Sequence, residues 1–198
     1  MNYWVPIIKD IILSVSAIVT VCLAIYGVKS WRRELAGKTK FDAAKRQLQA
    51  TFKIREAFWS ARSRFIAAAE FPPGYGGTLE QPTDEKQFEV FLHVYRKRWE
   101  PLWDAIQEFD VAALESEVLW DESVKQKTDQ IRACISTYRN SIDFELNHIR
   151  AGRDRDDDFS KKIRQDIAAS RDDEDPLSVE MRTAITQIEE VLKPHLKH

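Results

Sequence analysis

The chain has 198 residues, of which 43% are hydrophobic and 31% charged, and its net charge is −2. This length suits one domain plus an anchor, and the near-neutral charge argues against a general nucleic-acid-binding protein, which would carry a domain-wide basic excess. With only 6 glycines and 7 prolines, the composition favours long solvated helices over a turn-rich β fold. We therefore expect no nucleic-acid partner.

Residues 11–28 form an uninterrupted stretch of 18 positions without a charged side chain. That length approaches the roughly 20 residues a helix needs to cross a hydrocarbon core about 30 Å thick. Aromatic residues stand on both flanks, as in the interfacial belts of membrane proteins, and include Trp4 and Trp31. The sequence therefore predicts one transmembrane helix within an anchor at residues 1–30, with the lipid bilayer as its first partner.

Two other interpretations of this stretch differ from a membrane anchor in the features they require. A cleaved signal peptide carries its positive charge before the apolar region and a small-residue cleavage site after it. Here Lys9 is offset by Asp10, and no A-x-A site follows the apolar region. A buried core helix is the second alternative, although such a helix is rarely apolar on every face. The membrane anchor is the preferred interpretation.

The charges after the apolar stretch predict its orientation. Residues 29–46 contain seven Lys or Arg side chains against two acidic ones, and Lys29, Arg32 and Arg33 come first. By the positive-inside rule this flank stays in the cytoplasm. We expect a single-pass protein of the cell membrane, inner or plasma, with a short tail outside and the remaining domain inside. Inverted topology, giving an envelope-facing helical coil, is an alternative.

Helical hydrophobic spacing resumes after the anchor. Apolar residues three and four positions apart predict a helix over residues 39–70. This helix can continue the anchor helix, although Gly37 weakens the helix between the two segments. Residues 71–83, rich in proline and glycine, predict a connecting loop. The next helix begins at Asp84, where Gln87 completes a capping box. Pro101 is expected to kink or break it, leaving a second piece over residues 111–120.

Three further helices follow. Asp121 or Ser123 caps the first of them, and Gly152 ends it. Residues 153–198 hold a charged connector and C-terminal helices, the last of which begins with Pro176 behind the cap Asp175. They either form a mobile arm or dock. The predicted fold class is all-α: the anchor, then an antiparallel bundle of three long and one or two short helices over residues 31–152 and 153–198.

Glu145 and His148 form an E-x-x-H pair at the spacing that di-iron bundles use, and Glu89 with His93 is the one companion pair. Di-iron sites need two such pairs and further glutamates facing inward. A boundary histidine near a carboxylate is far commoner, so these four residues are weak nominees, and neither a metal nor another cofactor is expected. Phosphate-loop, dinucleotide, kinase, HExxH and GxSxG motifs are absent from the sequence.

Cys22 falls inside the apolar stretch and Cys134 lies in a predicted helix, so no disulfide framework is expected. Cys134 is predicted to be a buried structural thiol. The basic cluster at residues 96–98 is expected to form a solvated helix face.

The leading hypothesis is a non-enzymatic, membrane-tethered cytoplasmic module that binds a protein partner or another copy of itself, in an adaptor or regulatory role. It rests on a tether and heptad-like stripes without a catalytic constellation. The alternative is a helical-bundle sensor or enzyme that binds a small ligand or a metal through Glu145, His148, Glu89 and His93.

Overall fold

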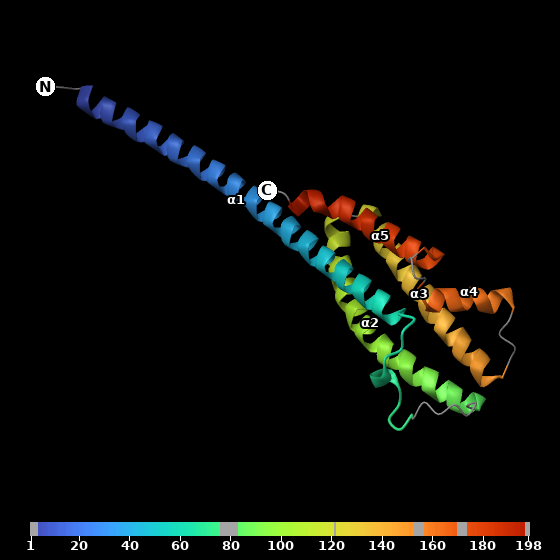
Figure 1. Cartoon of the computed structure of the whole chain (residues 1–198). Coiled ribbons are helices and arrows are strands. Elements are labelled where there is room, and N and C mark those ends of the chain that lie inside the picture. Colours follow the sequence, from blue (N-terminus) through green and yellow to red (C-terminus); the bar gives the residue numbers. More distant parts are fainter. Residues whose placement is uncertain (1–3, 76–82, 121, 153–156, 170–173, 197–198) are drawn as a thin grey trace. The chain divides into compact units, whose positions relative to one another are not determined.

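The computed structural model describes residues 4–75, 83–120, 122–152, 157–169 and 174–196. Within these ranges it contains five α-helices and two short 3-10 helices but no strand, which confirms the all-helical prediction for this part of the chain. The helices are α1 (Trp4–Ala61), η1 (Ala68–Glu70), α2 (Asp84–Trp120), α3 (Glu122–Arg150), α4 (Asp158–Ile167), α5 (Pro176–Leu192) and η2 (Lys193–Leu196) (Figure 1). The predicted cap at Asp121, most of the 71–83 loop and the connector at 153–156 lie outside the described ranges.

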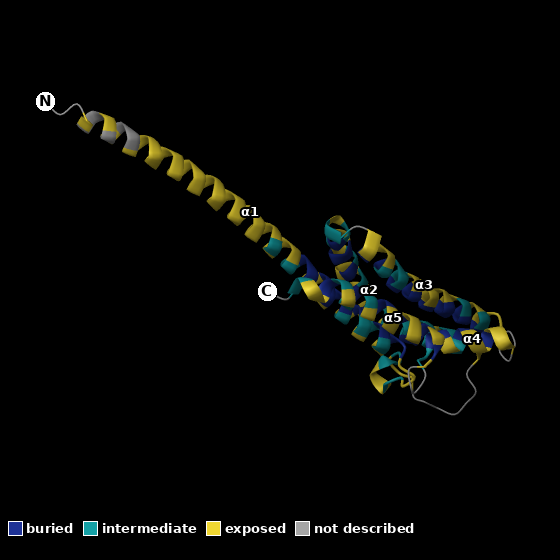
Figure 2. Ribbon diagram, turned by 90° about the horizontal axis from the view of Figure 1, so that it is seen from above, coloured by how far each residue is buried: buried dark blue, intermediate teal, exposed yellow. Residues whose placement is uncertain are grey.

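The chain divides into two compact units, residues 1–42 and 43–198. The first unit contains the N-terminal part of α1. Every described side chain from Ile12 to Leu35 is exposed, and Figure 2 shows this part of the helix in yellow. Among the side chains that the structure describes, the fully buried ones all lie in the second unit.

One hydrophobic core fills the second unit. It combines the C-terminal part of α1 with α2, α3, α4 and α5, and its largest fully buried aromatic side chains are Phe58, Phe109 and Tyr138. Helix α3 packs against α2, α4 and α5. Of the two arrangements open for residues 153–198, the described helices α4 and α5 adopt the docked one.

Salt bridges show that neighbouring helices run in opposite directions. Between α1 and α2, Arg46 pairs with Glu115 and Lys53 with Glu108, so residue numbers rise on one helix as they fall on the other. Between α2 and α3, Arg132 pairs with Asp110 and Thr128 donates to Glu117, which gives the same opposite order of residue numbers.

Two predicted helix limits were wrong. Helix α1 ends at Ala61, not near residue 70, and Phe65, predicted to continue its apolar stripe, is 76% exposed. Helix α2 continues through Pro101 as one element, so the predicted break and separate piece at 111–120 are not found. A proline in a helix costs about 3 kcal/mol. Burial of Val94 and Leu102 on either side of it offsets that cost, since each buried aliphatic side chain contributes about 1.5–3 kcal/mol.

The helix ends follow local rules with one displacement. The side chain of Thr83, not of Asp84, accepts a hydrogen bond from the Lys86 amide (3.4 Å), so the cap lies one residue before the predicted one, and Lys86 at the third position cannot complete a capping box. Asp175 caps α5 with Pro176 at its start, and Gly152 follows α3 with φ +59°, both as predicted. The Gly152 amide donates to the carbonyl of Ile149.

Replacement of Gly152 tests this helix end. Gly152→Ala should lower the free energy of unfolding by about 1 kcal/mol, because a Cβ is strained at positive φ. Gly152→Asn should lower the free energy of unfolding by a smaller amount, because asparagine tolerates the left-handed region. Urea unfolding of the detergent-solubilised chain, followed by tryptophan fluorescence, measures both. Equal losses for the two variants would show that the backbone conformation at residue 152 is not the cause.

Candidate functional site

The four metal nominees do not assemble into a site. Glu145 is buried and His148 half-buried on α3, while Glu89 is exposed and His93 half-buried on α2. All four lie in the described ranges, where no three His, Cys, Asp or Glu side chains come close enough together to hold a metal ion. The His148 ring instead packs on Phe144, with ring centroids 4.3 Å apart.

The core thiol is poorly suited to chemistry. Cys134 is buried, and burial raises the pKa of its thiol to about 12. It therefore stays protonated near neutral pH, whereas a nucleophilic cysteine acts as the thiolate. Cys22 and Cys134 are both free cysteines.

The most strongly buried charge in the described chain is Arg62, the residue after α1, whose side chain is 1% exposed. Its Nε donates to the carbonyl of Asp166 (2.9 Å), and Nη1 donates to the Ser178 hydroxyl (2.7 Å). Its Nη2 donates to the carbonyl of Gln165 (2.9 Å) and to the carboxylate of Asp175 (2.7 Å). One guanidinium thus joins the end of α1 to the end of α4 and the start of α5.

We call these contacts of Arg62 with α4 and α5 the arginine clamp. Asp175 takes part in this clamp and also caps its own helix, α5. Its carboxylate accepts hydrogen bonds from the Ser178 amide (3.0 Å) and the Ser178 hydroxyl (2.7 Å), which cap α5. The backbone of Arg62 adds a further link, because its carbonyl accepts a hydrogen bond from the Ala169 amide (3.0 Å). The sequence predicted that Asp175 caps a helix, but it did not predict the ion pair of Asp175 with Arg62. The available signal was a charge at Arg62, four residues after the core residue Phe58.

The basic cluster at residues 96–98 is not the purely solvated face that was expected. Arg98 pairs with Glu70 and donates to the backbone carbonyls of Ser63 and Phe65. Lys97 donates to the carbonyl of Ala69 (2.6 Å). The hydrogen bond from Arg98 holds the pKa of the Glu70 carboxyl below its usual value. These side chains hold the segment after α1 in its non-helical path.

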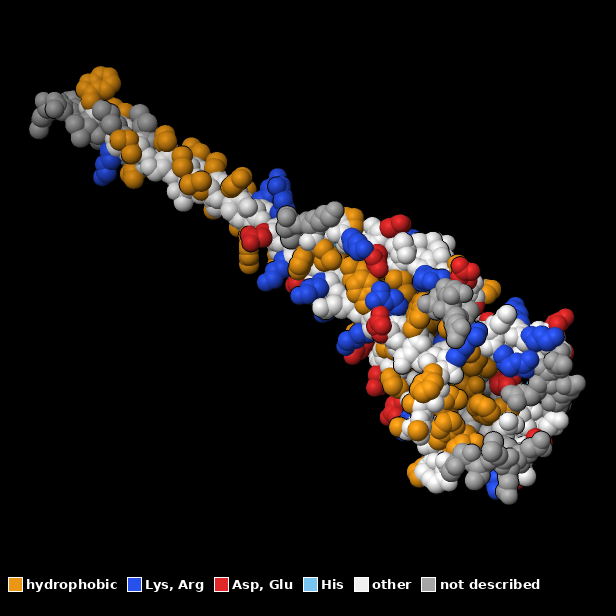
Figure 3. Space-filling model, viewed as in Figure 1, with side chains coloured by type: hydrophobic (Ala, Val, Ile, Leu, Met, Phe, Trp, Pro, Cys, Tyr) orange, Lys and Arg blue, Asp and Glu red, His pale blue; other side chains and the backbone are white. Residues whose placement is uncertain are grey.

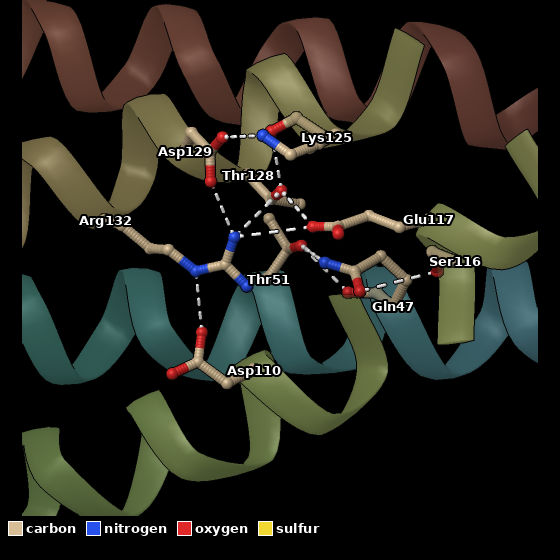
Figure 4. Close-up of polar contacts among 9 residues, drawn as sticks. All are labelled: Gln47, Thr51, Asp110, Ser116, Glu117, Lys125, Thr128, Asp129 and Arg132. Carbon is tan, nitrogen blue, oxygen red and sulfur yellow. Dashed lines mark hydrogen bonds and ion pairs between the residues drawn. The ribbon is translucent and has the colours of Figure 1, made fainter. Parts of the chain in front are cut away.

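A third polar cluster joins α2 to α3 (Figure 4). Arg132 donates to the carboxylates of Asp110 (2.8 Å) and Asp129 (2.8 Å), and it also pairs with Glu117 (3.4 Å). Hydrogen bonds from Lys125 and then Arg132 hold the pKa of Asp129 below its usual value. Asp110 and Glu117 of α2 are thus paired with Arg132 of α3, while Asp129 is paired with bases of its own helix, so the cluster orients α2 and α3.

Next to these side chains, a separate group of three polar residues is fully buried between α1 and α2. Gln47 donates to the hydroxyl of Thr51 (3.4 Å), and Ser116 donates to the side-chain carbonyl of Gln47 (3.5 Å). Figure 4 shows the three side chains pointing toward one another. Buried polar groups that satisfy one another specify one packing register.

The apolar stretch of α1, unlike these buried clusters, is exposed. Helix α1 is the one described helix long and apolar enough to cross a membrane, by length and composition alone, and none of its most apolar part is buried. The hydroxyls of Ser16 and Thr20 donate to the carbonyls four residues earlier, each at 2.8 Å. The predicted flanking residues are all exposed, namely Trp4, Lys29, Trp31, Arg32 and Arg33. Figure 3 shows hydrophobic side chains along this part of α1, followed by basic ones.

A groove with a volume of about 1060 Å³ lies between α1 and α2 in the second unit. It is lined by α1 residues between Arg46 and Ala57 and by α2 residues between Pro101 and Glu115. Its lining is mostly apolar, and it carries neither a histidine nor a cysteine.

Comparison with known proteins identifies no relative: no family model, curated protein or solved structure matches this chain.

Arg62 and Asp175 provide a direct test of the clamp. Arg62→Met should lower the free energy of unfolding by about 3–5 kcal/mol, because it leaves the Asp175 carboxylate buried without its counter-charge. Adding Asp175→Asn should recover part of that loss, since asparagine keeps the cap and removes the charge. The control Arg55→Met, which removes an exposed pair with Glu56, should cost less than about 1 kcal/mol. Equal costs for Arg62→Met and Arg55→Met would contradict the clamp.

Proposed function

We propose that this chain is a membrane-anchored, non-catalytic interaction protein, whose helical bundle lies in the cytoplasm and binds a protein partner. One observation carries the anchor on which the proposal depends: every side chain of α1 from Ile12 to Val28 is exposed, and none of the most apolar part of the helix is buried. A soluble protein rarely exposes a large contiguous apolar patch, and a lipid bilayer is the solvent in which such a helix is stable.

The backbone and polar side chains of this stretch support the same proposal. In hydrocarbon, each polar group has to be satisfied within the segment. A helix satisfies its own backbone, and the hydroxyls of Ser16 and Thr20 bond to carbonyls of the preceding turn. The exposed bases Lys29, Arg32 and Arg33 at the end of the stretch favour the cytoplasmic side.

The non-catalytic half of the proposal rests on how the charged groups of the second unit are used. The three most extensively bonded arginines, Arg62, Arg98 and Arg132, hold helix ends and helix pairs together. The nominated carboxylates and histidines are dispersed over α2 and α3. A groove with a mostly apolar lining remains, and such grooves commonly bind a helix of another protein.

Affinity isolation from membranes tests both halves. Membranes carrying the tagged chain are washed with alkaline carbonate, gently solubilised and analysed by mass spectrometry. The full chain should stay in the washed membranes and return a protein partner in near-stoichiometric amount. A control chain that lacks residues 1–30 should leave the membrane fraction and lose that partner. Recovery of the full chain in the soluble fraction would contradict the anchor, and recovery of the chain alone would contradict the adaptor role.

A further inference from the structure

The floor of the groove between α1 and α2 consists of small side chains in register. Ala50 and Ala57 lie seven residues apart on α1, as Ala105 and Ala112 do on α2, and all four line the groove. Seven residues correspond to two helical turns. The salt bridges Arg46–Glu115 and Lys53–Glu108 set the antiparallel register, which brings the two alanine pairs to matching heights. Small residues leave a trench that larger side chains would have filled.

The dimensions of the trench fit a third helix. From Arg46 to Ala57, α1 rises roughly 16 Å, or about three turns. At Ala57 and Pro101 the trench continues into a second depression of about 370 Å³, which the exposed Phe65 helps to line. Helices pack with their axes about 8–10 Å apart when side chains of one enter the spaces of the other. A floor of alanines at two-turn intervals offers such spaces to large side chains.

Apolar side chains extend from the groove onto the exposed face of α2. Val111 lines the groove and is 72% exposed. Leu114 and Val118 continue the same face at heptad-like spacing, and Val118 is 81% exposed. Trp103 adds a partly exposed aromatic ring one turn before Gln107, which also lines the groove. An amphipathic helix seated in the groove would cover this edge.

Charge decides which kind of helix fits. Between Trp99 and Trp120, α2 carries six acidic side chains and no basic one. Four of these acids pair with Arg46, Lys53 or Arg132. Glu100 and Asp104 are exposed and form no ion pair within the described ranges, and Asp104 lines the groove. Two α2 faces of different copies would bring like charges together, and an anionic bilayer would be repelled in the same way.

We propose that the groove between α1 and α2 binds an amphipathic helix of a protein partner, with apolar residues at heptad spacing and basic residues on its flanks. This inference rests on the proposed adaptor function and specifies the chemistry of the partner. The apolar residues of the partner enter the alanine-floored trench and cover Val111. Its basic flank faces Asp104 and Glu100.

The test uses the full chain in nanodiscs of zwitterionic lipid, with binding to empty nanodiscs subtracted. The probe is a dye-labelled helical peptide of about five turns, with leucine at heptad positions and lysine on both flanks. Fluorescence anisotropy should show binding that weakens as salt is added. A twin peptide with glutamate in place of every lysine should bind at least about tenfold more weakly.

A pair of matched variants locates the binding surface. Val111→Lys should weaken binding of the lysine peptide by about tenfold or more, because the substitution puts a positive charge at the groove. Val179→Lys makes the same change on α5, at a valine that is 45% exposed and outside the groove lining, and should leave the affinity unchanged. Circular dichroism of both variants checks that the helices are intact.

Several outcomes would overturn the proposal. Absence of peptide binding, or equal affinities for Val111→Lys and the unaltered chain, would show that the groove does not take a basic helix. Self-association of the unaltered chain that Val111→Lys abolishes, measured by size-exclusion chromatography with light scattering, would assign this face to a second copy. If the peptide does not bind but affinity isolation still returns a protein partner, the adaptor function stands and only the assignment of the groove as its binding site is contradicted.

Discussion

Arg62 lies directly after the last residue of α1, and its guanidinium reaches acceptors more than a hundred positions further along the chain. Removing a guanidinium from water costs several kcal/mol, and that cost is offset only where every donor finds an acceptor in good geometry. Here the acceptors come from the end of α4 and the start of α5, so the two short helices have to take one arrangement for the charge to be satisfied. The arrangement of the end of α4 and the start of α5 against the end of α1 therefore depends on this side chain.

The same interaction explains where prediction from sequence succeeded and where it failed. Periodicity located every long helix, and local rules identified Gly152 and Asp175 at helix ends, because both kinds of signal are short-range. The end of α1 was misplaced because the apolar spacing continues past Ala61. What stops the helix is long-range: the Tyr138 hydroxyl donates to the carbonyl of Ala61, and Arg98 holds the carbonyls that follow. No local pattern encodes those contacts.

The candidate site was less predictable than the fold. The long apolar helix could be identified from composition, since recognising it needs no knowledge of its neighbours. The E-x-x-H pair was visible too, but spacing alone could not show that its companions lie apart on another helix. The alanine-floored groove could not be found from sequence, because it depends on the register between α1 and α2. That register is fixed by salt bridges and by the buried group of Gln47, Thr51 and Ser116.

The two units thus use their side chains in opposite ways. Residues 43–198 enclose an apolar core, and their most strongly buried charge, Arg62, is paired with Asp175, which is the pattern of a protein folded in water. In the first unit the apolar groups face outward and the helix satisfies its own polar groups, as a bilayer requires. With the proposed anchor, the basic residues between the two patterns would lie at the bilayer surface.

The two cysteines make the central claim measurable without any substitution. Cys22 is exposed on the apolar part of α1, whereas Cys134 is buried in the core. Membrane vesicles containing the native chain are treated with a water-soluble maleimide, and labelled peptides are identified by mass spectrometry after digestion. If α1 crosses the bilayer, both thiols should stay unlabelled in intact vesicles and react after denaturation in dodecyl sulfate. Rapid labelling of Cys22 in the intact vesicles would show that this segment faces water, and would contradict the account.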